Sequence, residues 1–187
     1  MAKSAAKASA ARMPAFSGRD FSAKGVKFAV LAPAHRLALR APAASVPALS
    51  KALGVPLPTT PKSSATNASR AALWLGPDEW LVIDDGANDP LDECAKVMAL
   101  HSAVGISHRN VGISVTGPGA ANTISAGCPQ DLSLTAFPVG ACSRTIFGKV
   151  EIVLLRRAED AFRVECWRSF SDYVVTFLTE AAKDAAA

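Results

Sequence analysis

The amino-acid sequence predicts an α+β fold of two related halves, each with a small antiparallel sheet covered by helices. Short segments that alternate apolar and polar residues are typical of half-buried strands, and amphipathic segments between them are typical of helices. The order of strand, small residue, proline and helix occurs twice, once around Pro42 and once around Pro118. Half of the 187 residues are hydrophobic, which is enough for one shared core.

Charge and pattern divide the chain into three regions. We expect residues 1–24 to form a flexible basic tail, residues 25–102 the first α+β half, and residues 103–187 the second half, packed with the first as one domain. The formal net charge is +4, and four basic residues precede the first acid, Asp20: Lys3, Lys7, Arg12 and Arg19. The charges of the remaining chain therefore sum to zero.

Nine segments have the alternation or the β-branched content that predicts strands. The last of them would turn Phe162, Val164 and Cys166 to the core, and Arg163 and Glu165 to water or to a partner. The predicted strands span residues 26–31, 36–40, 71–75, 80–84, 105–109, 112–116, 143–147, 150–155 and 162–167.

Four helices are predicted from their end signals as much as from their periodicity. The first begins at Ser45 and ends at Leu53, where Gly54 suits the left-handed position that follows a helix. The third is short and spans residues 117–127, with a proline in its first turn. Its small apolar residues should let it pack closely on a sheet.

The second and fourth helices are predicted to be amphipathic. The second begins at Asp89 with Pro90 in its first turn, and the fourth begins at Ser169, which forms a capping box with Asp172. The apolar face of the second helix contains Leu91, Cys94, Ala95 and Met98. The apolar face of the fourth contains Phe170, Val174, Phe177 and Ala181. We expect the fourth helix to dock on the second half.

The sequence offers no evident catalytic centre. A side-chain nucleophile needs a neighbouring base, and the obvious bases are His35, His101 and His108. None lies in a recognisable catalytic motif, and we expect His101 at the end of the second helix and the other two at the surface. We therefore assign no catalytic residue, no cofactor-binding residue and no metal ligand to this chain.

The four cysteines do not have the spacing of a metal site. Cys94, Cys128, Cys142 and Cys166 form no C-x-x-C pair and have no histidine at ligand spacing. Cys94 and Cys166 fall on predicted apolar faces, where a free cysteine packs as a small hydrophobic side chain. Free thiols fit a reducing compartment, so we expect a cytoplasmic protein.

The segment Thr116-Gly-Pro-Gly119 leaves two interpretations open. A strand that runs into glycines and then into a helix N-terminus can bind phosphate. This segment lacks the Walker lysine, and Pro118 removes one amide donor, which favours a plain turn between strand and helix.

The composition disfavours a membrane or a nucleic acid as partner. No apolar run approaches the roughly 20 residues of a membrane-spanning helix. No acid occurs between Asp20 and Asp78, but this basic bias comes without a recognisable nucleic-acid motif. A stand-alone nucleic-acid module remains an alternative, whereas we expect the bias to complement another protein surface or the acidic second half.

Three residues are candidates for contact with another protein, although half-exposed arginine is also common on ordinary surface. Arg144 and Arg168 lie beside predicted strand and helix ends, and arginine is enriched at protein interfaces. Trp80 follows the Gly76-Pro77-Asp78 turn, where it fits either a core position or an anchor for a partner. Our candidate interface residues are therefore Arg144, Arg168 and Trp80.

Several motifs resemble the gamma subunit of heterotetrameric sarcosine oxidase. The likeness covers residues 25–182, and its most specific part runs from Phe137 to Tyr173. The motifs that carry it are Leu75-Gly-Pro-Asp-Glu-Trp-Leu81, Ser114-Val-Thr-Gly-Pro118, Asp131-Leu-Ser133, Phe137-Pro-Val-Gly140, Cys142-Ser-Arg-Thr145 and Trp167-Arg-Ser-Phe170.

The resemblance implies a fold similar to the folate-binding aminomethyltransferase domain. It also implies a non-catalytic subunit that assembles with alpha, beta and delta subunits into a complex that demethylates sarcosine to glycine, with tetrahydrofolate accepting the one-carbon unit and oxygen the electrons. The other subunits would bind FAD, FMN, NAD, zinc and tetrahydrofolate. Two alternatives remain: the small subunit of a related complex such as N-methylglutamate dehydrogenase, and a stand-alone folate-dependent aminomethyltransferase-like protein.

Overall fold

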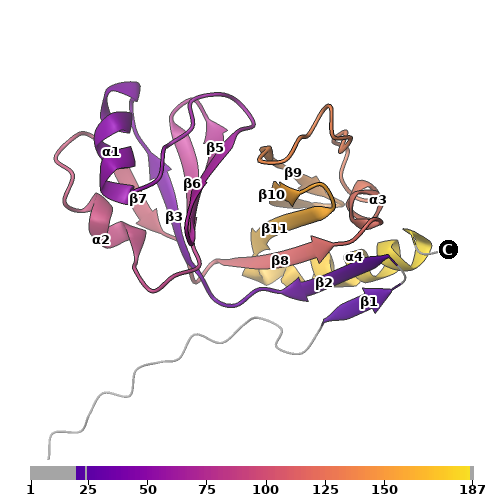
Figure 1. Ribbon diagram of the computed structural model, residues 1–187. Coiled ribbons are helices and arrows are strands. Elements are labelled where there is room, and N and C mark those ends of the chain that lie inside the picture. The colour runs from indigo at the N-terminus through magenta and orange to yellow at the C-terminus, as the bar shows by residue number, and fades with distance from the viewer. Residues whose placement is uncertain (1–19, 24, 186–187) are drawn as a thin grey trace, which may run out of the picture.

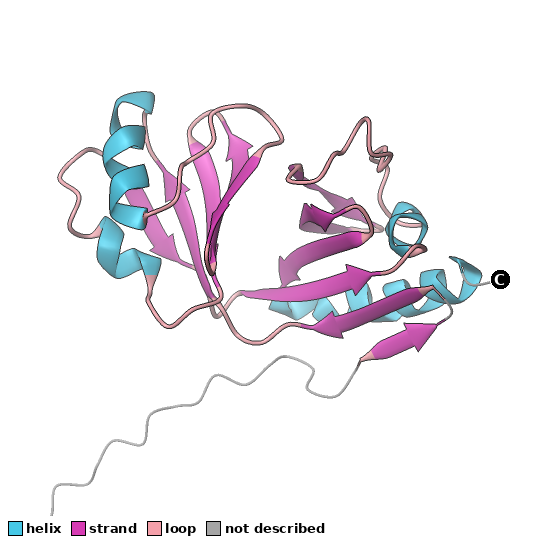
Figure 2. Ribbon diagram, in the orientation of Figure 1, coloured by secondary structure: helices cyan, strands magenta, loops and turns pink. Residues whose placement is uncertain are grey.

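A computed structural model describes residues 20–23 and 25–185 and shows two antiparallel sheets between outer helices (Figure 1). One sheet has six strands in the order β1-β2-β8-β11-β10-β9, and the other has five in the order β4-β5-β6-β3-β7. Figure 2 shows α1 and α2 on the outer side of the five-stranded sheet, with α3 and α4 beside the six-stranded sheet. The predicted α+β class is confirmed.

The strands follow the sequence closely where apolar and polar residues alternate. They are β1 (Phe21–Ala23), β2 (Val26–Val30), β3 (His35–Arg40), β4 (Ser64–Asn67), β5 (Arg70–Gly76), β6 (Glu79–Asp84), β7 (Ser102–Gly105), β8 (Asn110–Thr116), β9 (Cys142–Phe147), β10 (Val150–Ala158) and β11 (Ala161–Trp167). The helices are η1 (Ala43–Ser45), α1 (Val46–Leu53), α2 (Pro90–Cys94), α3 (Ala120–Ser125), η2 (Arg168–Phe170) and α4 (Ser171–Ala185).

The two halves repeat one order of elements. The first unit runs β3, α1, β4, β5, β6, α2, and the second runs β8, α3, β9, β10, β11, α4. In each unit the last three strands form a meander whose third strand pairs with the first strand of the unit, giving β4-β5-β6-β3 and β9-β10-β11-β8. The repeat that the sequence pattern indicates is therefore present in the topology.

Each sheet contains a further strand that is not part of its own unit. In the sequence, this strand lies just before the unit that forms the other sheet. β2 comes just before β3 but pairs with β8, from Lys27↔Thr116 to Val30↔Ile113. β7 comes just before β8 but pairs with β3. The segment expected to open the first half thus belongs to the sheet of the second half. β1 lies within the range predicted as a tail and extends that sheet, while residues 1–19 and 24 lie outside the described residues.

Three apolar clusters fill the spaces between these layers. The largest lies between the six-stranded sheet and helices α3 and α4, and the second lies between the five-stranded sheet and helices α1 and α2. The third lies between the two sheets, and its members include Leu73, Ile83, Cys142, Val153 and Leu155. Because fully burying one large apolar side chain contributes about 1.5–3 kcal/mol, the third cluster is a substantial part of what joins the halves.

Two helix signals are confirmed. Gly54 has φ 64° and ends α1 in the left-handed conformation, which a glycine adopts without steric strain. The side chain of Asp89 accepts a hydrogen bond of 3.0 Å from the backbone N–H of Leu91 and so caps α2. Among the described residues, no helix combines the length and the apolar character that crossing a bilayer requires.

Other predicted boundaries are wrong. β7 ends at Gly105, so the predicted strand 105–109 is a turn in which His108 is exposed. Helix α2 ends at Cys94, and Met98, expected on its apolar face, is 97% exposed.

The start of the fourth helix also differs from the prediction. α4 begins at Ser171, and the expected cap Ser169 lies inside the preceding 3-10 turn, η2. Phe170 is exposed, whereas Val174 is buried in the cluster beneath the six-stranded sheet and Ala181 is also buried. The predicted start is two residues too early, because the 3-10 turn before α4 contains the same residue types that commonly cap a helix.

Candidate functional site

The three histidines are dispersed and none contacts a nucleophile. His35 Nδ1 lies 3.1 Å from Asp89 Oδ2, without hydrogen-bond geometry. His101 Nδ1 lies 2.7 Å from the carbonyl oxygen of Ala99, and His108 is exposed in a turn. Within residues 20–23 and 25–185, no hydrogen bond joins a histidine to a serine, threonine, cysteine or lysine side chain. These residues therefore do not form a nucleophile–base pair.

All four cysteines are buried and free. Burial raises the pKa of Cys94 to about 11 and the pKa values of Cys142 and Cys166 to about 12, because a thiolate loses its hydration in the core. The thiols of Cys94, Cys142 and Cys166 are thus poor nucleophiles at neutral pH. In the described part of the chain, no group of three or more His, Cys, Asp or Glu side chains is arranged to hold a metal ion.

The glycines of the turn at Gly117 to Gly119 allow the backbone to pack closely against Gly25. Gly117 has φ 108°, and a Cβ atom on it would lie 2.4 Å from the carbonyl oxygen of Gly25. The backbone N–H of Gly117 donates to Asp160 O, that of Gly119 to Gly25 O, and that of Ala120 to Gly117 O. Because these amides already have acceptors within the protein, the plain-turn interpretation is the one that the structure supports over a phosphate loop.

An ion network crosses the space between the two sheets. Arg36 on β3 donates to both carboxylate oxygens of Glu165 on β11, with an Nε–Oε2 distance of 2.6 Å and an Nη2–Oε1 distance of 3.1 Å. Arg163 Nε donates to Glu165 Oε1 at 2.8 Å, and Arg163 Nη1 donates to Asp85 at 2.9 and 3.0 Å. The Arg36 and Glu165 side chains are only 2% and 1% exposed. The prediction that Arg163 and Glu165 face water or a partner is wrong, because the first half covers them.

Gly112 on β8 leaves the room that this network occupies. A Cβ atom on Gly112 would lie 2.7 Å from Glu165 Oε1 and 3.0 Å from Arg36 Nη2. Glu165 and Gly112 are paired across strands β11 and β8, so the contact is fixed by sheet register. A side chain at this position would displace the carboxylate from Arg36.

Trp80 is a core residue, which corrects its assignment to a partner surface. Its side chain is 1% exposed and belongs to the cluster between the five-stranded sheet and its helices. The indole N–H donates a hydrogen bond of 2.7 Å to the carbonyl oxygen of Pro58. Through this hydrogen bond, Trp80 holds the proline-rich loop after α1 against the five-stranded sheet.

Arg144 links the two sheets at their surface. It lies on β9 and pairs with Glu79 at the start of β6, with an Nη1–Oε2 distance of 3.5 Å and a closer contact through Nη2. Both side chains are partly exposed. Contact of Arg144 with another subunit stays a prediction, in competition with this pairing inside the chain.

Arg168 lies in an exposed group of aromatic and arginine side chains where β11 meets α4. We call Arg109, Trp167, Arg168, Phe170 and Tyr173 the aromatic–arginine patch. The guanidinium carbon of Arg109 lies 5.0 Å from the centroid of the Trp167 ring, which in turn lies 6.1 Å from the ring of Phe170. The backbone N–H of Arg168 donates to the carbonyl oxygen of Arg109 at 2.6 Å. The position of Arg109 beside Trp167 was not predictable from the sequence, because β8, α3, β9 and β10 lie between them in the chain.

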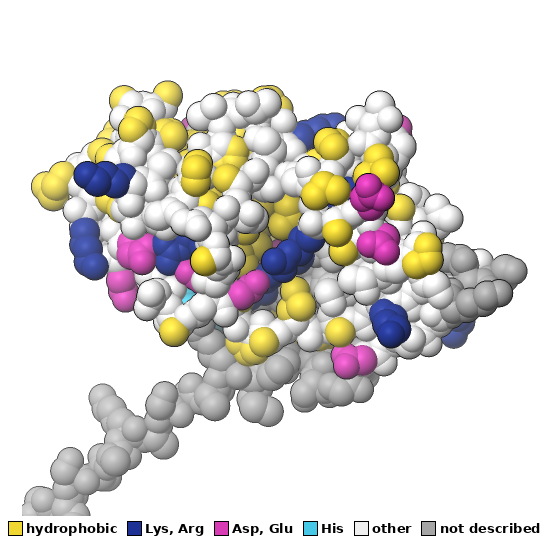
Figure 3. All heavy atoms as spheres, in the orientation of Figure 1, with side chains coloured by type: hydrophobic (Ala, Val, Ile, Leu, Met, Phe, Trp, Pro, Cys, Tyr) yellow, Lys and Arg dark blue, Asp and Glu magenta, His cyan; other side chains and the backbone are white. Residues whose placement is uncertain are grey.

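A shallow groove connects this patch to the Arg144–Glu79 pair. It has a volume of about 50 Å³, and Arg109, Trp167, Arg144 and Glu79 all line it. Of the three predicted interface residues, Arg144 lines this groove and Arg168 lies beside it, whereas Trp80 also lines it but is only 1% exposed. Figure 3 shows one face of the molecule, with basic and acidic side chains near the hollow between the two halves.

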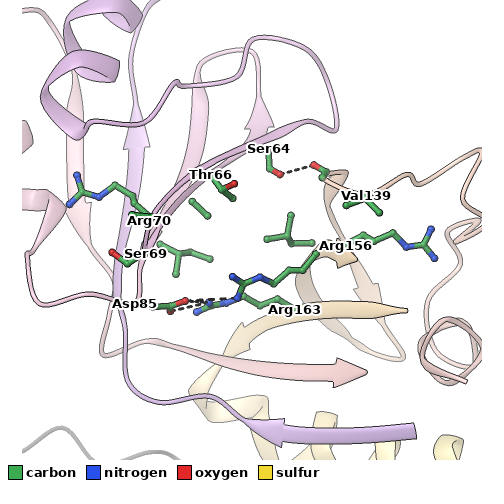
Figure 4. Close-up of a pocket in the computed structure, with 14 residues that line it drawn as sticks. Ser64, Thr66, Ser69, Arg70, Asp85, Val139, Arg156 and Arg163 are labelled. Atoms are coloured by element: carbon green, nitrogen blue, oxygen red, sulfur yellow. Dashed lines mark hydrogen bonds and ion pairs between the residues drawn. The ribbon is translucent and has the colours of Figure 1, made fainter. Parts of the chain in front are cut away.

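A larger cavity opens between the sheets on the side of β4, β5, β10 and β11 (Figure 4). It has a volume of about 280 Å³, and the one carboxylate that lines it, Asp85, already accepts two hydrogen bonds from Arg163. Sites for drug-sized ligands usually have about 300–1,000 Å³. This cavity therefore does not fit a folate cofactor anchored by a free acidic side chain.

The chain is an α+β protein whose fold is similar to that of an aminomethyltransferase. The structure of glycine cleavage system aminomethyltransferase T from Bartonella henselae matches with a TM-score of 0.61 at 11% identity, covering 83% of this chain and 46% of that one. At this identity the likeness establishes the fold alone.

Within that class, the chain belongs to the sarcosine oxidase gamma subunit family. The family model described as "Sarcosine oxidase, gamma subunit family" matches residues 38–184. The sarcosine oxidase gamma subunits of Corynebacterium sp. strains U-96 and P-1 are similar at 29% identity over 140 residues and 30% over 146 residues. These matches cover 73% of this chain in both cases, and 68% and 69% of the two relatives.

A solved complex gives the same assignment. One chain of the heterotetrameric sarcosine oxidase from Corynebacterium sp. U-96, in complex with pyrrole 2-carboxylate, matches with a TM-score of 0.82 at 29% identity. The match covers 89% of this chain and 88% of that chain. The resemblance noted in the sequence motifs is thus confirmed over nearly the whole fold.

Replacing Glu165 by glutamine should destabilise the chain by about 3–5 kcal/mol, because two buried guanidinium groups would lose their shared negative charge. Urea unfolding of the purified chain measures this change. Lys183→Gln is the control, since the Lys183–Glu180 pair is exposed and should contribute about 1 kcal/mol or less. An equal decrease in the free energy of unfolding for both variants would show that the buried network contributes no more to stability than an exposed ion pair.

Gly112→Ala should lower the free energy of unfolding by about 1–3 kcal/mol, because its methyl group would push against the Arg36–Glu165 pair. Gly105→Ala on β7 is the matched control: its Cβ would meet Leu91 Cδ2 at 3.5 Å, an ordinary contact. Thermal and urea unfolding of both variants measure the difference. A destabilisation by Gly105→Ala as large as that by Gly112→Ala would refute the packing explanation.

Proposed function

We propose that this chain is the non-catalytic gamma subunit of a heterotetrameric sarcosine oxidase, in which it supplies surface for assembly. The observation that carries the proposal is the match to one chain of a solved heterotetrameric complex over most of both chains. The dispersed histidines and the buried thiols of high pKa add support, because neither makes a reactive group within the described residues.

In this proposal the chemistry belongs to the assembled complex. The complex demethylates sarcosine oxidatively to glycine, with tetrahydrofolate receiving the one-carbon unit and oxygen the electrons. The alpha, beta and delta subunits bind FAD, FMN, NAD, zinc and tetrahydrofolate. Four free buried thiols support a location in the reducing cytoplasm.

The aromatic–arginine patch is the surface that we assign to subunit contact. Trp167 and Phe170 are 40% and 44% exposed although they are large and apolar, and Arg109 and Arg168 lie beside them. Tryptophan, tyrosine and arginine carry most of the binding energy in many interfaces, since they combine large contact area with directional hydrogen bonds. A partner surface with acidic groups around an apolar centre would complement this patch.

Co-expression with the large flavoprotein subunits tests the proposal as a whole. We expect this chain to co-elute with them as one particle that oxidises sarcosine, and we expect the isolated chain to leave sarcosine unchanged. Size-exclusion chromatography and an oxygen-consumption assay measure the two outcomes. A chain that remains separate at micromolar concentration, or that turns over sarcosine alone, would contradict the proposal.

Arg168→Glu should weaken assembly at least about tenfold, because it places a negative charge in a basic contact surface. The melting temperature of the isolated chain should change by less than about 3 °C, since the Arg168 side chain is exposed. Titration of the purified partner subunits and a thermal melt give the two values.

Lys51→Glu, on α1 of the other half, is the control and should leave assembly unchanged. If Arg168→Glu lowers stability as much as it lowers affinity, Arg168 is a structural residue and not an interface residue.

A further inference from the structure

The ion network between the sheets carries one positive charge in excess. Arg36, Arg157 and Arg163 contact two carboxylates, Glu165 and Asp85. Arg157 makes the weakest of these contacts, with its Nη1 atom 4.0 Å from Asp85 Oδ2 and its side chain 53% exposed. A guanidinium stays charged at all physiological pH values, so the excess charge resides on Arg157 at the edge of the cavity.

Arg163 also has a hydrogen-bond donor without an acceptor. Its side chain is 4% exposed, its Nε and Nη1 atoms donate to Glu165 and Asp85, and its Nη2 atom has no partner among the described residues. A buried donor without an acceptor destabilises a protein by about 1–3 kcal/mol, which is why nearly all such groups are paired. Arg163 lines the same cavity as Arg157.

The other arginines of the cavity wall have partners elsewhere. Arg70 pairs with Asp84 and Glu93, and Arg156 donates to the carbonyl oxygens of Phe137 and Leu132 at 2.6 and 3.0 Å. In Figure 4 the guanidinium groups of Arg70 and Arg156 point away from the space between the sheets, whereas Arg163 reaches Asp85 at its floor. The cavity therefore presents Arg157 and Arg163 to a ligand.

The opposite wall is polar but uncharged, and the remainder is apolar. Ser64, Thr66 and Ser69 come from β4 and the turn after it, while Val139 and Leu155 also line the cavity. The hydroxyls of Ser64 and Ser69 already donate to Gly140 O and Asp84 Oδ1, so Thr66 is the wall hydroxyl that can donate to an anion. With about 280 Å³ available, the cavity suits a ligand of a few non-hydrogen atoms and excludes a dinucleotide or a folate.

We propose that this cavity binds a small oxyanion, held by Arg157 and attracted by the neighbouring charge of Arg163. A guanidinium matches two oxygens of a carboxylate or a phosphate with two parallel N–H donors, and charge-assisted bonds of this kind are about twice as strong as neutral ones. A cation is disfavoured, because both oxygens of Asp85 already accept hydrogen bonds. The site lies apart from the aromatic–arginine patch, so it goes beyond the proposed assembly function and does not depend on it.

Calorimetric titration of the full chain at low ionic strength tests the site with two probes, inorganic phosphate and malonate. We expect one saturable site for at least one probe, with a Kd below about 5 mM. Arg157→Gln should weaken binding by about tenfold or more, because it removes the excess charge and its donors. Arg40→Gln is the control and should leave the affinity unchanged, since Arg40 is exposed, pairs with Asp78 within the first half and does not line the cavity.

Tighter binding of phosphate identifies a phosphoryl ligand and tighter binding of malonate identifies a carboxylate, and either result supports the site. Absence of saturable binding with both probes, or equal affinity in Arg157→Gln, overturns it. A second measurement uses the unaltered chain: bound phosphate should protect Arg157 from phenylglyoxal, as read by peptide mass spectrometry. Modification of Arg157 at the same rate with and without phosphate also overturns the site.

Discussion

The ion pair between Arg36 and Glu165 is the contact on which the packing of the two sheets depends. It joins β3 of one sheet to β11 of the other, and both side chains are almost fully buried. Two ions taken out of water are stable only when their geometry is good and their remaining donors are satisfied. Arg36 meets this condition through Glu165 and the carbonyl oxygen of Ala34, and Glu165 meets it through Arg36 and Arg163. The apolar cluster lies in the same space between the sheets, and the Arg36 and Glu165 side chains are shielded from water there.

The exchange of strands between the two repeats makes this packing a property of the whole chain. β2 precedes the first unit in the chain but completes the six-stranded sheet, and β7 precedes the second unit but completes the five-stranded sheet. Separation of the halves would therefore break two strand pairings as well as the ion network. A body of this kind presents its surfaces in fixed relative positions, which lowers the entropy that is lost when another subunit binds. The aromatic–arginine patch, built where β11 meets α4, benefits directly from that rigidity.

The sequence predicted the positions of the strands better than it predicted which elements pack on their faces. Alternation placed Phe162, Val164 and Cys166 in the core correctly, because period two decides which residues share a face. It said nothing about the second face of β11, where a whole sheet covers Arg163 and Glu165. β4 was missed because Ser64–Asn67 has no apolar alternation and is a strand only through its pairing with β5.

The candidate site was less predictable than the fold. Trp80 could not be assigned to core or surface from its neighbours, since its environment comes from Pro58 and the helices of the first half. Arg157 and Asp85 belong to different halves, and only the packing of the sheets brings them together. Family motifs, in contrast, predicted the protein family correctly, because they combine many positions along the chain. No single pair of residues identifies that family.

Hydrogen exchange under native conditions, measured across a series of low urea concentrations, tests most directly whether the network joins both halves into one unit. The opening free energies of backbone amides in β6 and in β10 give the stability of each sheet separately. One common value for both strands, equal to the global free energy of unfolding, is the predicted result. Two distinct values, with one sheet opening while the other stays protected, would contradict the central role of the Arg36–Glu165 contact.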